Sequence, residues 1–300
     1  MTSPSGASSP LSNLSTDGIQ VTIGPFLVRV QSDLDQVHQH FTRLYADFPV
    51  DSASGGHFGV TIARAGGIRR LVRPQARIGA NGAQPFLPLP PAISGAAFEW
   101  TLNWCIARHA HQRIAVHGAV VERDGGALIL SGPSGSGKST LCAALVLQGW
   151  RLFSDEFALI DPNSRSLLPL PRPISLREAA IDIIRKRGLS LVFGPEGRDV
   201  EGARFAHLKP PRESVRRAGE PAPARVIVLP RYAAGAPTLL EPITKARALI
   251  HLIDQSFNYN YLGAGGYECV VDVVRQCDCY ALDYSDLDDA LAVLSKVTRR

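Results

Sequence analysis

The fold of this chain is decided by one stretch, Gly132-Pro133-Ser134-Gly135-Ser136-Gly137-Lys138-Ser139. It has the spacing of a P-loop, in which glycines let the backbone wrap phosphates and successive N–H groups point inward as donors. In this pattern the lysine reaches the β- and γ-phosphates, and the following hydroxyl is a ligand of magnesium. We therefore predict a site for ATP and Mg²⁺ formed by Gly132, Pro133, Ser134, Gly135, Ser136, Gly137, Lys138, Ser139 and Thr140.

The segments on either side of the loop have the character that a P-loop requires. Gly126–Leu130 is apolar and predicts a strand that runs directly into the loop. Residues 139–147 predict a helix, and Gly149 stands where a helix commonly ends. The positive end of that helix dipole favours bound phosphate. No base-reading motif is visible, so the sequence does not separate ATP from GTP.

An acidic pair, Asp155-Glu156, follows Lys138 by 17 residues. Residues 151–154 read as a strand that Phe157–Ile160 continues, and this strand can lie beside the P-loop strand. One carboxylate can then hold magnesium, as Ser139 does, while the other accepts a proton from an attacking hydroxyl. The pattern leaves open which is the base, and the alternative interpretation is a solvated acidic turn. His117, at the start of a predicted strand 117–121, can face the phosphates or be a packed strand residue.

Composition restricts the class of protein. The longest apolar runs are far shorter than the roughly 20 residues of a membrane span, and the Ser- and Pro-rich start lacks the character of a signal peptide. We expect a disordered leader over 1–18, a cytoplasmic location and no membrane partner. Net charge is +5, and 27 of the 32 basic residues are Arg. No helix-turn-helix, zinc finger or basic-aromatic stripe accompanies them, so we expect no nucleic-acid partner.

Two parts are predicted along the chain. Residues 19–92 form an N-terminal α+β module that ends near the proline-dense segment 85–91, and residues 93–300 form the P-loop domain. Alternating strands and helices predict an α/β fold, and residues 194–219 are expected to be a mobile polar loop. The further elements are predicted helices over 33–45, 98–109, 177–186, 246–256, 266–274 and 286–296, and strands over 20–23, 26–30, 57–63, 225–229 and 280–283.

Three segments in this order resemble the C-terminal domain of HPr kinase/phosphorylase: His117-Gly118-Ala119-Val120, the P-loop, and Gly149-Trp150-Arg151-Leu152-Phe153-Ser154-Asp155-Glu156. A later stretch is similar to that family's later segment, with Lys245-Ala246-Arg247, Asn258-Tyr259 and Gly266-Tyr267-Glu268. Over roughly residues 19–295 the chain resembles the HPr-kinase-related kinase A group, through Gly24-Pro25-Phe26, Leu102-Asn103-Trp104-Cys105 and Leu170-Pro171-Arg172-Pro173.

This resemblance implies a P-loop kinase domain of the HPr kinase and phosphoenolpyruvate carboxykinase type, and phosphoryl transfer from ATP to a serine hydroxyl. It implies Asp155 as the catalytic base, Glu156 in a metal or assisting role, His117 in contact with phosphate, and Arg247 stabilising transferred charge. It also implies a homo-oligomer and a protein or peptide acceptor, such as a small carrier protein or a ribosomal peptide. The family's second signature, an acidic residue followed by Arg-Gly-Leu-Gly, is absent, so phosphorylase activity is not implied.

Two other functions are compatible with the same motif. A regulatory or scaffold protein would bind ATP through the loop and transfer little phosphate. A small-molecule kinase would combine the loop with a basic acceptor pocket. Phosphoproteomics of cells with and without the chain separates the first of these from a protein kinase.

Overall fold

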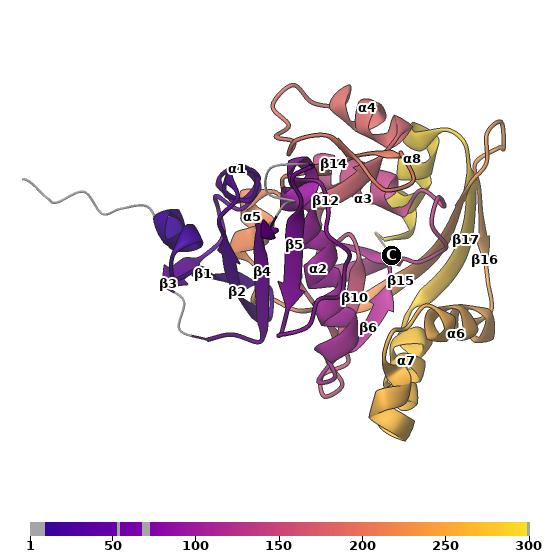
Figure 1. Cartoon of the computed structure of the whole chain (residues 1–300). Helices are drawn as coiled ribbons and strands as arrows, with labels where there is room; N and C mark the ends of the chain where they lie inside the picture. Colours follow the sequence, from indigo (N-terminus) through magenta and orange to yellow (C-terminus); the bar gives the residue numbers. More distant parts are fainter. Residues whose placement is uncertain (1–9, 53–54, 68–72, 299–300) are drawn as a thin grey trace, which may run out of the picture. The chain divides into compact units, whose positions relative to one another are not determined.

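The computed structural model describes residues 10–52, 55–67 and 73–298, and the chain divides into two units, Met1–Cys105 and Ile106–Arg300. The first unit is built on a five-stranded sheet in the order β3-β1-β2-β4-β5 (Figure 1). Its strands are β1 (Ile19–Ile23), β2 (Phe26–Ser32), β3 (Val50–Ser52), β4 (Phe58–Arg64) and β5 (Ala76–Ala80). The sequence predicts helices over 33–45 and 98–109, and the structure has α1 (Asp35–Leu44) and α2 (Ser94–His109), the second beginning four residues earlier than predicted.

The division between the units falls inside α2, after Cys105, and not near residue 92 where the prolines predicted it. The reason is the packing of the first turns of α2. Phe98 lies against Phe41 with ring centroids 4.8 Å apart, and Glu99 accepts hydrogen bonds from His40 and Tyr45 at 2.8 Å. These contacts place most of α2 in the core of the first unit.

The predicted disordered leader also differs from the structure where it is described. Residues 1–9 lie outside the described residues, but Pro10–Ser15 forms a 3-10 helix that contacts β1, β2 and β3. Leu14 on this turn is buried, and the Gly18 N–H donates to the Asn13 carbonyl at 2.8 Å. One apolar side chain and a closed turn therefore hold residues 10–18 against the sheet.

The second unit is built on a nine-stranded sheet whose central strands are parallel. The path runs β6-β10-β11-β15-β8-β7-β9, and β17 pairs with β15 and β16. The strands are β6 (Ile114–His117), β7 (Ala119–Arg123), β8 (Gly126–Leu130), β9 (Arg151–Ser154), β10 (Phe157–Ile160), β11 (Ser166–Leu168), β15 (Ala222–Tyr232), β16 (Leu239–Pro242) and β17 (Asp278–Tyr284). Because β8, β15 and β17 are parallel, their carboxyl ends meet at one edge of the sheet, where α/β folds commonly bind ligands.

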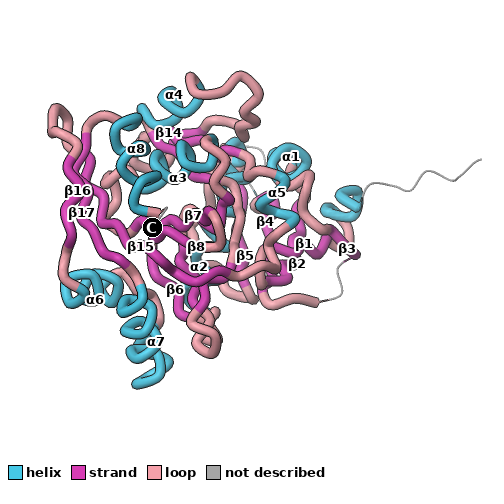
Figure 2. Tube along the Cα trace, turned by 180° about the vertical axis from the view of Figure 1, so that it is seen from behind, coloured by secondary structure: helices cyan, strands magenta, loops and turns pink. Residues whose placement is uncertain are grey.

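Helices cover both faces of this sheet, and strand alternation explains how. Leu128 and Leu130 of β8 belong to one apolar cluster, whereas Ala127 and Ile129 belong to the other. Figures 1 and 2 both show α3, α4 and α8 gathered on one side of the sheet, and α6 and α7 on the other. The helices are α3 (Lys138–Leu147), α4 (Ala179–Arg185), α5 (Arg212–Arg216), α6 (Lys245–Asp254), α7 (Gly263–Gln276) and α8 (Leu287–Val297).

Two sequence predictions about this unit are wrong. Phe157–Ile160 does not continue the preceding strand, because the chain turns at Asp155 and β10 pairs with β6 instead. Residues 194–219 are not one loop: they hold β13 (Gly197–Arg198), β14 (Arg204–Leu208) and α5, and β14 pairs with β12 (Ile174–Arg177). The buried side chains Phe205 and Leu208 anchor this small sheet in the core.

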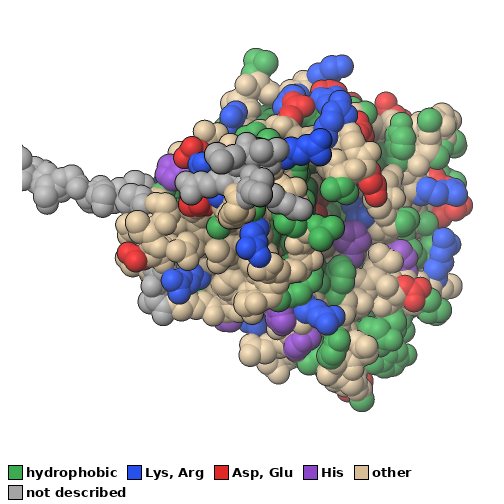
Figure 3. Space-filling view, in the orientation of Figure 1, with side chains coloured by type: hydrophobic (Ala, Val, Ile, Leu, Met, Phe, Trp, Pro, Cys, Tyr) green, Lys and Arg blue, Asp and Glu red, His purple; other side chains and the backbone are tan. Residues whose placement is uncertain are grey.

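Many arginines of the second unit are paired with carboxylates. Arg204 lies 3.1 Å from Asp182, and Arg187 lies 2.7 Å from Asp288. At the top of Figure 3, in the region of α4, basic and acidic side chains lie side by side. All five cysteines are buried, and none of them forms a disulfide. Within the described ranges, no helix has both the length and the apolar character needed to cross a membrane.

Candidate functional site

The glycine-rich loop lies between β8 and α3, as its sequence predicts. Gly137 takes a φ of 94°, which a side chain rarely adopts, and a Cβ at this position would overlap the Tyr284 hydroxyl. The Tyr232 N–H donates to the Ser136 carbonyl at 3.2 Å. The loop is therefore supported from the ends of β15 and β17, which supply these two tyrosines.

Lys138 is buried at the start of α3 and turns back over the loop. Its Nζ donates to the carbonyl oxygens of Gly132 at 2.6 Å and Pro133 at 3.0 Å. Burial lowers the pKa of Lys138, while the charges of Asp155 and Glu156 oppose that shift. The ammonium group thus lies within electrostatic reach of both acidic residues.

Asp155 is the most perturbed carboxyl of this site. Burial, followed by the neighbouring charge of Glu156, raises its pKa to about 7, against lowering contributions from Ser175, Ser139 and Lys138. Oδ2 accepts a hydrogen bond from the Ser175 N–H at 2.9 Å. Oδ1 is buried and has no hydrogen-bond partner among the described residues. A buried carboxylate oxygen without a partner is costly unless a ligand satisfies it.

The residues around Asp155 fit a small divalent cation. The Ser139 hydroxyl interacts with Asp155, and the Glu156 carboxyl is adjacent in sequence. These are hard oxygen donors, and they are too few for a complete protein cage. Mg²⁺ commonly uses one or two carboxylates and completes its shell with water and phosphate oxygens. The donor set, with the unpartnered Oδ1, therefore suits magnesium better than a metal that needs nitrogen or sulfur.

The acidic pair reaches the loop by a route that differs from the predicted one. β9, which ends at Ser154, pairs with β7 and not with the P-loop strand β8, whose neighbours are β7 and β15. A turn after β9 then carries Asp155 back toward α3. In this turn the Ser154 hydroxyl accepts from the N–H groups of Glu156 at 3.2 Å and Phe157 at 3.0 Å.

His117 ends β6 and joins the same group. Its carbonyl accepts from the Ser131 hydroxyl at 3.0 Å, and its N–H donates to the Gln255 carbonyl at 2.8 Å. Burial and the charge of Lys138 lower the pKa of His117, whereas a hydrogen bond with the Glu156 backbone raises it by less. The imidazole is consequently neutral near pH 7 and can donate or accept one hydrogen bond.

Arg247 acts on other groups than the acidic pair. It is exposed in the first turn of α6, and its charge acts on Asp283 and on His251. His251 is the group that connects Arg247 to the loop. Burial lowers the pKa of His251, and the charge of Lys138 also lowers it.

Sequence reasoning missed three contributors to this site. His251 follows Arg247 by four residues, so helical periodicity could have placed both on one face of α6. Ser175 acts through its backbone N–H, and Tyr284 through its position against Gly137, so neither has a local sequence signal.

Asn258, which is part of the family resemblance, stabilises the backbone near the site. Its side chain is buried, accepts from the Ala115 N–H at 2.9 Å, and donates to the carbonyls of Arg113 at 2.8 Å and Ala110 at 3.2 Å. It therefore fixes the turn that leads into β6 and His117.

A family model matches part of the chain. Residues 98–172, which are 75 of the chain's 300, match a family model described as SynChlorMet cassette protein ScmC. The matched segment includes the glycine-rich loop, α3 and the acidic pair. Among curated proteins, none matches this chain.

Proposed function

We propose that this chain is an ATP-dependent kinase that transfers the γ-phosphate to a serine hydroxyl of a protein or peptide. The observation that carries the proposal is the convergence of Lys138, Ser139 and Asp155 at the carboxyl edge of β8. Motor and switch proteins share the loop. The family resemblance and the buried carboxyl with a pKa near 7 favour transfer to an acceptor.

Each residue has a distinct role in this proposal. Asp155 accepts the proton of the serine hydroxyl. At the same time the serine oxygen bonds to the γ-phosphorus, and the bond between that phosphorus and the leaving ADP oxygen breaks. Lys138 leaves the loop carbonyls and contacts the phosphates, and the loop N–H groups hold the remaining oxygens. Ser139 with Asp155 or Glu156 would hold magnesium, which would supply positive charge to offset the charge developing on the phosphates.

His117 and Arg247 have supporting roles in this proposal. Neutral His117 donates a hydrogen bond to phosphate without adding charge beside Lys138. Arg247 is exposed, and its long side chain can meet the incoming acceptor or the transferred group. Phosphoryl transfer depends mainly on positioning and charge neutralisation, and these residues supply both.

The resemblance to HPr-kinase-related kinases supports the choice of a serine acceptor. The match to the ScmC family model covers the segment that holds both the loop and Asp155. The description of that family names no reaction. The acceptor class and the preference for ATP over GTP belong to the proposal.

The proposal is tested by label transfer. The purified chain is incubated with γ-labelled ATP, Mg²⁺ and a lysate of the cells that make it, and labelled proteins are identified as phosphoserine-containing by mass spectrometry. Lys138→Ala should lose ATP binding, and Asp155→Asn should bind ATP but transfer little. ATP binding without any labelled protein or small molecule would instead favour the regulatory or scaffold function, and a labelled small molecule alone would identify a small-molecule kinase.

A further inference from the structure

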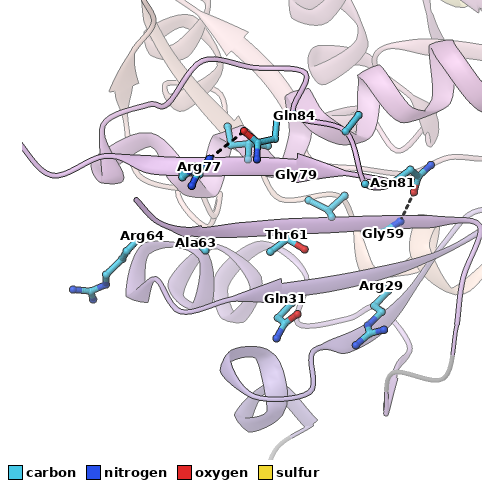
Figure 4. A pocket seen from close by; sticks show the side chains of 14 residues that line it. Arg29, Gln31, Gly59, Thr61, Ala63, Arg64, Arg77, Gly79, Asn81 and Gln84 are labelled. Atoms are coloured by element: carbon cyan, nitrogen blue, oxygen red, sulfur yellow. Dashed lines mark hydrogen bonds between the residues drawn. The ribbon is translucent and has the colours of Figure 1, made fainter. Parts of the chain in front are cut away.

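The outward face of the N-terminal sheet is polar and hollowed. Strand alternation directs Val28, Val60 and Ile78 into the core and leaves the residues between them facing outward. The outward positions are Arg29 and Gln31 on β2, Gly59, Thr61 and Ala63 on β4, and Arg77 and Gly79 on β5. These seven positions, with Arg64, Asn81 and Gln84 beside them, are called here the sheet trough (Figure 4).

Side-chain size gives the trough its shape. Residues on the middle strand β4 are small, whereas longer side chains stand on β2 and β5. The register sets Arg29 beside Gly59 on one side, and Arg77 beside Ala63 on the other. The result is a cavity of about 550 Å³ that runs along β4, with Arg29 on one side strand and Arg77 on the other in Figure 4.

The trough carries positive charge that its own residues do not neutralise. Arg29, Arg64 and Arg77 are exposed, and none of the fourteen described lining residues is acidic. Arg29 donates to the Asp17 carbonyl at 3.1 Å and Arg77 to the Gln84 amide oxygen at 3.4 Å, both neutral acceptors. This differs from the second unit, where arginines such as Arg204 meet carboxylates. Arg29 and Arg77 on the outward face, with Arg64 at the end of β4, indicate an anionic ligand.

The spacing favours an extended polymer over a single anion. Arg29 and Arg77 are offset by four residues of β4, which is about 13 Å along the trough at 3.3 Å per residue. The two side strands are separated by two strand spacings, about 10 Å, which admits one extended chain and excludes a nucleic-acid duplex. The described lining contains no aromatic residue on which single-stranded bases could stack.

We propose that the sheet trough binds an extended acidic segment of a partner protein. Arg29 and Arg77 pair with its carboxylates, while Thr61, Gln31 and Gln84 supply hydrogen bonds to its backbone. The trough would then be a docking site for the phosphate acceptor, and this role, unlike the binding itself, rests on the proposed kinase function.

The binding is tested with the full chain in the absence of nucleotide. Fluorescence anisotropy measures the affinity for a labelled peptide of alternating glutamate and threonine, for the matching glutamine peptide, and for an oligothymidylate. We expect the glutamate peptide to bind more tightly than both other probes and to weaken with added salt. The double variant Arg29→Glu, Arg77→Glu should weaken that binding by about tenfold or more.

Two further variants test whether a loss of peptide binding comes from the trough itself, from the change in net charge, or from misfolding. Arg43→Glu, an exposed change on α1, should bind the peptide as the wild type does. Gly79→Val narrows the trough from β5, and its Cβ would lie at an ordinary 3.7 Å from Thr61 Cβ, so the fold should persist while peptide binding weakens. Circular dichroism melting checks that each variant is folded.

The outcomes are distinct from those of the kinase test. Equal affinity of the wild type and the double variant would overturn the proposal, as would equal binding of the glutamine peptide or tighter binding of the oligothymidylate. Because no nucleotide is present, loss of phosphate transfer alone contradicts the kinase function and leaves peptide docking intact.

Discussion

Asp155 is the residue on which the proposed chemistry depends most, and its burial has a consequence for stability. Its pKa is raised to about 7 in the folded protein, against an ordinary value of 3.8. The folded state therefore holds the proton more tightly than the unfolded state, and the free energy of unfolding falls as the pH rises from about 4 to about 7. Above that range the nucleotide-free protein carries the full cost of a buried charge.

Asp155→Asn removes this cost. We expect the variant to be more stable than the wild type at pH 8 by on the order of 2 kcal/mol, with the difference disappearing near pH 4. Urea unfolding at several pH values, without nucleotide or magnesium, measures it. A constant difference across this range would contradict the assignment of the raised pKa to Asp155.

Gly137 gives a second prediction at the residue scale. Gly135 and Gly137 both have positive φ, but only a Cβ at Gly137 would overlap Tyr284. Gly135→Ala should cost about 1 kcal/mol of stability through its backbone alone, whereas Gly137→Ala should cost about 1–3 kcal/mol more through overpacking. Thermal melting of the two variants separates these effects, and equal losses would contradict the close packing of Tyr284 on the loop.

At the scale of elements, a buried ion pair joins β7 to β9. Arg151 Nε lies 2.6 Å from Glu122 Oε2, and both side chains are less than one tenth exposed. Arg151→Met leaves a buried carboxylate without its partner and should cost on the order of 3 kcal/mol. The pair Arg165–Asp272, whose side chains are 33% and 41% exposed, provides the control, since Arg165→Met should cost less than about 1 kcal/mol. Urea unfolding at pH 7 compares them, and equal costs would show that burial does not govern the pair.

The elements nearest the loop are those that the sequence predicts best. The strand at 126–130, the helix from Lys138 to Leu147 and the glycine that follows it all carry local signals of apolar period and turn chemistry. Gly149 indeed has a φ of 87° just after α3. Confirmed predictions of this kind depend only on residues close together in sequence.

The pairing of distant segments is what local patterns did not predict. Phe157–Ile160 is apolar like β9, and only its contacts with β6 show that it is a separate strand. Residues 204–208 look polar in sequence because Arg204 and His207 interrupt the apolar residues, although β14 is buried against β12. Asp155 can be identified as a candidate from its residue type and its position after the loop. Its hydrogen bond with the Ser175 N–H cannot be predicted, because it joins segments that are distant in sequence.

At the scale of the whole molecule, the two units carry different candidate sites. The first holds the sheet trough with its exposed arginines, and the second holds the glycine-rich loop with Asp155. If the trough docks the acceptor, the double variant Arg29→Glu, Arg77→Glu should raise KM for the protein acceptor by about tenfold and leave kcat and ATP affinity unchanged. Steady-state kinetics measure this, and a lower kcat with unchanged KM would contradict a docking role.

The central claim is that Lys138, Ser139 and Asp155 form one phosphoryl-transfer centre. The most direct measurement compares Asp155→Asn with the wild type in two readings, the Kd for ATP by calorimetry and the rate at which phosphoserine forms on an acceptor by mass spectrometry. The account predicts a Kd within a few fold of the wild-type value and a rate lower by roughly 10²–10⁴-fold, the usual contribution of a general base. An unchanged rate in this variant, or a wild-type protein that binds ATP and forms no phosphoserine, would contradict it.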